Sequence, residues 1–191
     1  MRVSTEMVKT LRARTGAGVM DCRRALEEAN GDLDAAVALL RAKGLAAAAK
    51  RAGRAATEGV VEAYVHPGSR LGALVEVNCE TDFVARTEEF RTLARELAMQ
   101  VAATAPRYVS KNDVPPEELA LRRAEILRES PGASDDEVER QLGLWCAEVA
   151  LLEQPYIRDA GRRVADVVAD AVARTGEDIR VRRFARFRLG E

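Results

Sequence analysis

The stretch GVVEAYVHPGSRLGALVEVNCETDFVAR, residues 59–86, holds the clearest information about the fold in this sequence. Apolar and polar residues alternate on both sides of the turn signal HPGSR, which is the pattern of two half-buried strands joined as a hairpin. A loop of residues 67–69 would make His66 face Arg70. The register predicted from this loop places three apolar pairs on one buried face, which are Val61 with Val75, Ala63 with Ala73, and Val65 with Leu71.

Helical patterns follow the hairpin. Apolar residues at helical spacing extend from Phe90 to Val101 and again over residues 164–172. Between them, patterns at about 117–129 and 135–152 are divided by SPGAS and predict an antiparallel helical hairpin at about 115–152. Residues 179–189 alternate again and predict a last strand. We therefore expect residues 59–191 to form an α+β core, in which a three-stranded antiparallel sheet packs with helices.

The N-terminal part of the chain has a different pattern, with three short helical segments separated by TGAG at 15–18 and NGD at 30–32. Asp32 can cap the third helix and Gly44 can end it. Residues 1–44 are thus expected to form a compact three-helix domain. Residues 45–58, rich in alanine and lysine without a broad apolar face, are expected to be an exposed and partly helical linker.

Composition excludes several classes of protein. The chain has 191 residues, of which 47% are hydrophobic, so it can bury a substantial core. Its formal charge of −1 predicts no general attraction to nucleic acid. The three cysteines are far apart and match no metal-binding spacing, so we expect neither disulfides nor a metal site, and a reducing cytoplasm fits best. The chain has no apolar signal core and no run long enough to span a membrane.

The usual catalytic motifs are missing from this sequence. It contains no phosphate-binding loop with a Lys-Ser/Thr tail, no dinucleotide fingerprint, no HExxH and no GxSxG. His66 is the single histidine and lies beside a tight turn, where a structural hydrogen-bonding role is favoured over catalysis. We therefore expect a protein that is not an enzyme and that needs no cofactor.

Two further motifs have a plain and a functional interpretation. TGAG resembles a phosphate-binding turn, but a turn between two helices is favoured. The basic stretch RVRRFARFR, residues 180–188, fits nucleic-acid binding, yet its arginines are more simply explained by cross-strand pairing with Glu62 and Glu76. The sheet face predicted to carry these charges also has four apolar residues, Val60, Tyr64, Leu74 and Phe184. Such a mixed face is suited to partial burial against another sheet or another subunit.

The turn after the second strand presents the clearest candidate for a functional residue. Asp82 and Phe83 lie side by side between the strand and the next helix. Phe83 could pack into the core of the protein, which is common for an aromatic residue. It could equally be an anchor that fills a pocket on a partner protein. The residues alone leave these two interpretations balanced.

Two long motifs resemble those of the bacterial elongation factor Ts family. These are LRARTGAGVMDCRRALEEANGDLDAAVALL at 11–40 and EVNCETDFVAR at 76–86, and shorter similarities extend over nearly the whole chain. The length resembles the short members, which have one core subdomain. Arg23 stands where the first motif usually has lysine, which keeps the charge and changes the hydrogen-bonding geometry.

The resemblance implies a ubiquitin-associated-like N-terminal domain, a core that forms a homodimer, and a function. Factors of this family bind elongation factor Tu with GDP and release the nucleotide so that GTP can bind. The expected partner-binding residues form three groups, namely a turn that opens the nucleotide site (Thr81, Asp82, Phe83, Val84), the N-terminal domain (Arg12, Gly16, Gly18, Val19, Met20), and possible contacts at Tyr64 and His66. The alternative is a non-enzymatic nucleic-acid-binding protein that uses the basic C-terminal strand.

Overall fold

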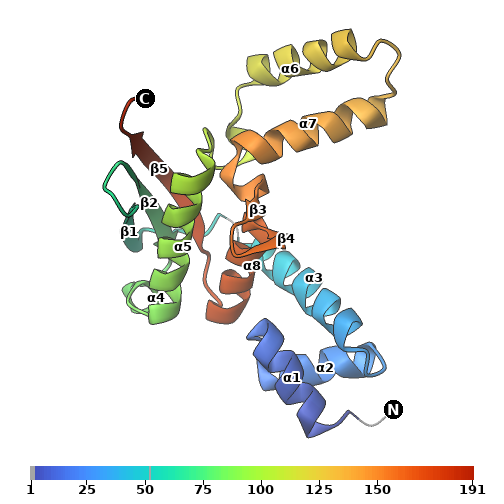
Figure 1. Cartoon of the computed structure of the whole chain (residues 1–191). Coiled ribbons are helices and arrows are strands. Elements are labelled where there is room, and N and C mark those ends of the chain that lie inside the picture. The colour runs from blue at the N-terminus through green and yellow to red at the C-terminus, as the bar shows by residue number, and fades with distance from the viewer. Residues whose placement is uncertain (1–2, 52) are drawn as a thin grey trace. The chain divides into compact units, whose positions relative to one another are not determined.

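The computed structural model describes residues 3–51 and 53–191 of the chain (Figure 1). Its fold is a mixture of helices and strands, which confirms the α+β class. The chain divides into two compact units. The first comprises Met1–Gly59, Asn78–Ala85 and Val168–Arg180, and the second comprises Val60–Val77, Arg86–Val167 and Val181–Glu191.

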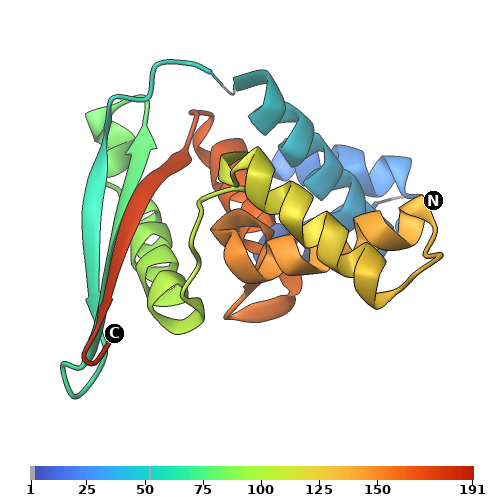
Figure 2. The ribbon, with the colours of Figure 1, turned by 90° about the horizontal axis from the view of Figure 1, so that it is seen from above.

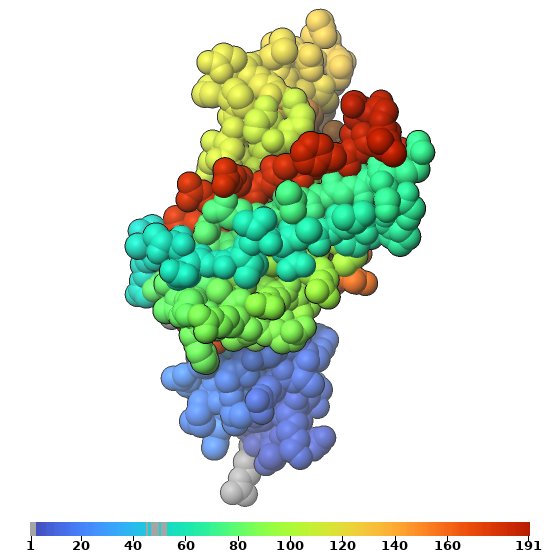
Figure 3. Space-filling model, turned by 90° about the vertical axis from the view of Figure 1, so that its left-hand side faces the viewer, coloured from blue at the N-terminus to red at the C-terminus, as the bar shows by residue number. Residues whose placement is uncertain are grey.

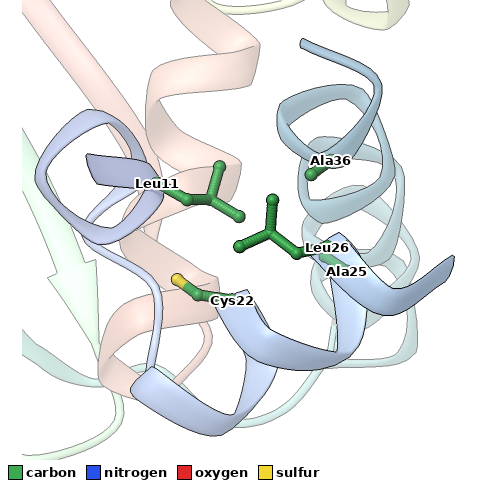
Figure 4. Packing of buried hydrophobic residues seen from close by; sticks show 5 residues of the cluster. All are labelled: Leu11, Cys22, Ala25, Leu26 and Ala36. Atoms are coloured by element: carbon green, nitrogen blue, oxygen red, sulfur yellow. The ribbon is translucent and has the colours of Figure 1, made fainter. Parts of the chain in front are cut away.

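Three helices open the first unit, as the N-terminal pattern predicts. They are α1 (Thr5–Thr15), α2 (Val19–Glu28) and α3 (Leu33–Arg51). Figure 4 shows side chains from all three packed together, and each of them is fully buried: Leu11, Cys22, Ala25, Leu26 and Ala36. The Asp32 side chain caps α3 by accepting the backbone N–H groups of Asp34 and Ala35 at 2.8 and 3.0 Å.

The expectation that Gly44 ends the third helix is wrong. Helix α3 continues through Gly44 to Arg51. Gly44 is buried, and a Cβ at this position would lie 3.5 Å from the Cβ of Ala173, so the glycine permits close packing against α8 (Val164–Thr175). The alanine-rich sequence that follows has high helix propensity and carries the helix onward.

The main sheet has three strands, as predicted, and their order is β1-β2-β5. Its strands are β1 (Glu58–Val65), β2 (Leu71–Cys79) and β5 (Arg180–Arg188). Helix α5 (Glu88–Thr104) lies along one face of the sheet (Figures 1 and 2). Both sides of this interface are apolar, since β2 buries Ala73, Val75 and Val77 while α5 buries Phe90, Leu93 and Leu97.

The predicted register of the hairpin is wrong by one residue. The N–H of His66 donates to the carbonyl of Leu71 at 2.8 Å, so His66 faces Leu71 and not Arg70. The loop therefore has four residues. Gly68 and Ser69 both have positive φ, at 92° and 55°, and this left-handed pair accommodates the additional loop residue.

A shift of one residue exchanges the two faces of β1. Val61 and Val65 are 67% and 62% exposed, and Ala63 is also exposed, where we expected all three to be buried. Glu62 lies on the inner side instead, where its carboxylate is 3.8 Å from the Arg95 guanidinium of α5. The cross-strand pairing predicted for Glu62 is therefore wrong.

Strand β5 also differs from the prediction. Arg186 is on the inner side, where its Nε donates to the Ala102 carbonyl of α5 at 3.0 Å, and Phe184 is half-buried. Phe187 is 71% exposed on the outer side. Arg182 and Arg183 both reach Glu76, at 3.6 and 2.6 Å, which confirms the pairing predicted for Glu76.

The rest of the second unit is mostly helical. Helices α6 (Pro116–Glu129) and α7 (Asp135–Val149) lie antiparallel in Figures 1 and 2 and form the predicted hairpin. The Ser134 side chain caps α7 by accepting the Glu137 N–H at 3.3 Å. A small pair of strands, β3 (Pro155–Tyr156) and β4 (Asp159–Arg163), was not predicted. Within the described residues, no helix is long and apolar enough to cross a membrane.

Candidate partner-binding site

The TDFV segment, defined as Thr81, Asp82, Phe83 and Val84, follows the C-terminal end of β2. Its last three residues belong to the single-turn helix α4 (Asp82–Ala85). Thr81 precedes this turn and supports its start, since the Thr81 hydroxyl accepts the Val84 N–H at 3.4 Å and the Thr81 carbonyl accepts the Ala85 N–H at 3.3 Å. The segment thus has a defined helical backbone.

The side chains of the TDFV segment point in different directions. Phe83 is 77% exposed, so it does not join the core of the protein, and one of the two interpretations of this residue is excluded. Asp82 is also exposed. Val84 is only 6% exposed and packs inside the unit. The segment therefore presents an exposed aromatic ring beside an exposed acid, on a backbone that is fixed by hydrogen bonds. Such an arrangement is suited to contact with another molecule.

Glu177, in the loop before β5, holds the start of the TDFV segment. One carboxylate oxygen of Glu177 accepts the N–H groups of Glu80 and Thr81, both at 3.1 Å. The other oxygen accepts the Thr81 hydroxyl at 2.6 Å. In return, the Glu80 carboxylate accepts the Asp178 N–H at 2.7 Å. Sequence reasoning missed Glu177, because no local pattern connects residues that are 96 positions apart.

Cys79 lies beneath the same segment and is fully buried. Its thiol donates to the Thr81 carbonyl at 3.2 Å. Burial, and after it the nearby Glu177 carboxylate, raises the pKa of the Cys79 thiol to about 11. The thiol is therefore protonated at neutral pH and acts as a structural hydrogen-bond donor.

The residues proposed in the N-terminal domain lie at the loop between α1 and α2 and beside it. Gly16 ends α1 with a φ of 69°, and its N–H donates to the carbonyl of Arg12 at 2.8 Å. Gly18 precedes α2, where Val19 and Met20 are 50% and 62% exposed. The TGAG segment is thus a turn between two helices, as favoured above, and it leaves two apolar side chains on the surface.

Tyr64 and His66 lie together in the second unit, at the end of the β-hairpin. The Tyr64 hydroxyl is 2.9 Å from Nδ1 of His66, and the His66 backbone N–H is already bound to Leu71. This arrangement agrees with the structural role favoured for the histidine. A contact of either residue with a partner stays a prediction.

The arginines of β5 are all engaged with carboxylates. Arg182 and Arg183 bind Glu76, Arg186 and Arg188 bind Glu191, and Arg180 binds Asp178. A hollow lined by Arg186, Arg188 and Arg70 lies beside this strand. Because each strand arginine has an acidic partner within the fold, the basic pattern has a structural explanation.

The described part of the chain offers no obvious position for a metal ion. No group of three or more histidine, cysteine or acidic side chains is arranged there to hold one. The three cysteines are free and buried. The exposed Asp82 and Phe83 of the TDFV segment and the exposed start of α2 are the best candidates for a functional surface.

Comparison with known proteins identifies the family of this chain. A family described as elongation factor TS matches residues 44–191. The elongation factor Ts of Carboxydothermus hydrogenoformans is 56% identical over 99% of this chain and 90% of its own length. Those of Caldanaerobacter subterraneus subsp. tengcongensis and Moorella thermoacetica are 55% and 54% identical, over 99% and 96% of this chain and 98% and 94% of their own lengths.

These similarities define the protein first as a translation elongation factor. The chain belongs to the elongation factor Ts family. This family assignment confirms the resemblance seen in the two long sequence motifs.

Proposed function

We propose that this protein is a guanine-nucleotide exchange factor. It binds elongation factor Tu carrying GDP, promotes release of the GDP, and stays bound to the nucleotide-free partner until GTP enters. The observation that carries the proposal is Phe83, which is 77% exposed on a short helix whose start is anchored by several hydrogen bonds.

The proposed mechanism is mechanical and electrostatic. An aromatic ring inserted between elements of the partner separates groups that otherwise complete the shell around Mg²⁺ and phosphate. The neighbouring Asp82 carboxylate disturbs hydrogen bonds and charge at the same place. Both effects lower the affinity for GDP. Since the coupling between two ligands is reciprocal, GDP weakens binding of the factor by the same free energy, and returning nucleotide displaces it.

The remaining candidate residues are assigned supporting roles. The exposed Val19 and Met20, with Arg12 and the glycine turn, are proposed to hold the GTP-binding domain of the partner. Tyr64 and His66 are proposed to contact another domain of it. No covalent bond changes in this process, so the factor needs no catalytic side chains or cofactor, and it would act in the cytoplasm with translation.

We also propose that the protein is a homodimer joined through the outer face of the sheet. Figure 3 shows this face, with β5 in red beside the strands of the hairpin. It carries exposed apolar side chains that a second copy would cover: Val61, Val65, Leu74 and Phe187. Two such sheets can stack face to face at about 10 Å and bury these residues.

Nucleic-acid binding is the alternative of another class. It would use the arginines of β5, but these are paired with Glu76, Asp178 and Glu191, so phosphate would have to compete with neighbouring carboxylates. We therefore prefer the exchange function. An RNA mobility shift that weakens with salt, and weakens further when Arg182 and Arg186 are replaced, would favour the alternative.

The proposal is tested by stopped-flow release of a fluorescent GDP analogue from elongation factor Tu of the same source. The expected result is a large increase in the release rate when the factor is added. A rate that does not change at saturating factor concentration would refute the exchange function.

A further inference from the structure

Glu177 is an acidic side chain that the proposed mechanism does not use. It is half-buried in the loop between α8 and β5, and its carboxylate faces the end of β2. It accepts two backbone N–H groups and one hydroxyl, which are charge-assisted hydrogen bonds and stronger than neutral ones. A side chain with three bonds to one short segment fixes the position of that segment.

Thr81 receives most of these contacts, and every polar atom of this residue is bound within the fold. Its N–H and hydroxyl donate to Glu177, and its hydroxyl oxygen also accepts the Val84 N–H. Its carbonyl accepts the Cys79 thiol and the Ala85 N–H. The residue before Asp82 therefore has little freedom to rotate or shift.

Glu80 makes the connection reciprocal. Its carboxylate accepts the Asp178 N–H at 2.7 Å and lies 3.5 Å from the Arg54 guanidinium. The Arg54 carbonyl in turn accepts a bond from Arg180 at 2.6 Å. The end of β2 and the loop before β5 thus hold each other through two carboxylates, one from each segment.

We propose that Glu177 is a positioning residue for nucleotide exchange, which acts by fixing the Thr81 backbone so that Phe83 is presented in one orientation. This inference rests on the exchange function proposed above. The Phe83 ring binds best when its position is already fixed in the free protein. A mobile ring would lose conformational entropy on insertion, and this loss would lower the affinity for the partner. Glu177 removes this cost before the partner arrives.

The test compares Glu177→Ala and Glu177→Gln in the wild-type background and in the Phe83→Ala background, with GDP release as the readout. We expect Glu177→Ala to slow release about tenfold, because Glu80 and the start of the TDFV segment lose all three hydrogen bonds to the carboxylate. Glu177→Gln keeps one acceptor oxygen and should fall between Glu177→Ala and the wild type. In the Phe83→Ala background, the Glu177→Ala change should alter the rate less than about twofold.

A matched control uses Glu153, which is also half-buried and lies 3.5 Å from a guanidinium of Arg163 in the second unit. Glu153→Ala should leave the rate near that of the wild type. If Glu177→Ala slows release equally with and without Phe83, or does not slow it at all, the positioning role is wrong.

A second measurement separates this inference from the exchange function itself. Amide hydrogen exchange of Glu80 and Thr81 should be at least tenfold faster in Glu177→Ala, while the amides of α5 stay unchanged. If the wild type releases no GDP, the proposed function fails, and the role in exchange fails with it. Unchanged amide protection at Thr81 would overturn the positioning itself, whatever the exchange assay shows.

Discussion

At the scale of single residues, Phe83 differs from the residues that hold its backbone in how far it is exposed to solvent. The ring is 77% exposed, whereas the groups below it are bound or buried, including Thr81, Cys79 and Val84. Exposed aromatic side chains on fixed backbones frequently dominate the energy of protein interfaces. In the proposed function, the side chain most important for binding the partner therefore contributes little to the stability of its own fold.

Replacement of Phe83 by alanine tests this separation of function from stability. We expect GDP release to slow at least tenfold, because the ring that separates the elements of the partner is gone. The free energy of unfolding, measured with urea, should change by less than about 0.5 kcal/mol, as for an exposed residue. Asp82→Ala should slow release in the same direction. Wild-type rates in both variants would refute the wedge mechanism.

Cys79 gives a prediction about pH. Its pKa is about 11 in the folded protein and close to 9.0 when the thiol is free. Because the unfolded chain loses this proton first, the stability that the buried thiol contributes is present below about pH 9 and is lost as the pH rises toward 11. The difference in unfolding free energy between wild type and Cys79→Ala should therefore shrink across this range. A constant difference would contradict the assignment.

At the scale of elements, the sequence predicted which helices and strands exist better than how they join. The three N-terminal helices, the hairpin, α5, the helical pair and β5 were all expected from periodicity. The register was not, because it depends on the number of loop residues, and a left-handed conformation at Ser69 is unusual for a residue other than glycine. The prediction that Gly44 ends the third helix was also wrong. A glycine within a helix can allow close packing instead of ending the helix.

The candidate site was predictable in part. The TDFV segment was found from its sequence motif, but the residues alone could not decide whether Phe83 faces inward or outward. Glu177 was missed because its contacts with Glu80 and Thr81 depend on how the end of β2 meets the loop before β5. Long-range contacts of this kind have no local sequence pattern.

Helix α7 carries one buried and one exposed leucine, and replacing each of them tests which face of the helix is buried. Leu142 is 7% exposed and packs with Ile126 of α6, whereas Leu144 is 58% exposed. Leu142→Ala should lower the free energy of unfolding by about 2 kcal/mol or more, and Leu144→Ala by less than about 0.5 kcal/mol. Trp145, the single tryptophan, lies on this helix and reports its unfolding by fluorescence. Equal losses in both variants would show that the inner face of α7 is wrongly assigned.

At the scale of the whole molecule, the outer face of the sheet is the main feature that one chain leaves uncovered. The corrected register gives this face Val61 and Val65 from β1, Leu74 from β2 and Phe187 from β5. Apart from Leu74, these are not the apolar residues predicted for this face from the sequence, because Val60, Tyr64 and Phe184 are half-buried instead. The four exposed apolar side chains are the basis for proposing a second copy at this face.

Light scattering tests the proposed dimer. At micromolar concentration we expect twice the mass of the 20.8 kDa chain. Val61→Lys should give the monomer, since it places a charge in the apolar contact. Leu144→Lys, a similar change at an exposed leucine of α7, should leave the dimer intact. A wild-type protein that is monomeric under these conditions would reject the dimer.

The central claim, that this protein releases GDP from elongation factor Tu, is tested most directly by catalytic turnover. Elongation factor Tu loaded with a fluorescent GDP analogue is mixed with excess unlabelled GTP and a much smaller amount of this protein, and the fluorescence is followed over time. Our account predicts that the entire bound analogue is released at a rate proportional to the amount of factor, because each molecule is displaced by nucleotide and acts again. Release at the spontaneous rate, with the partner from the same source, would contradict it.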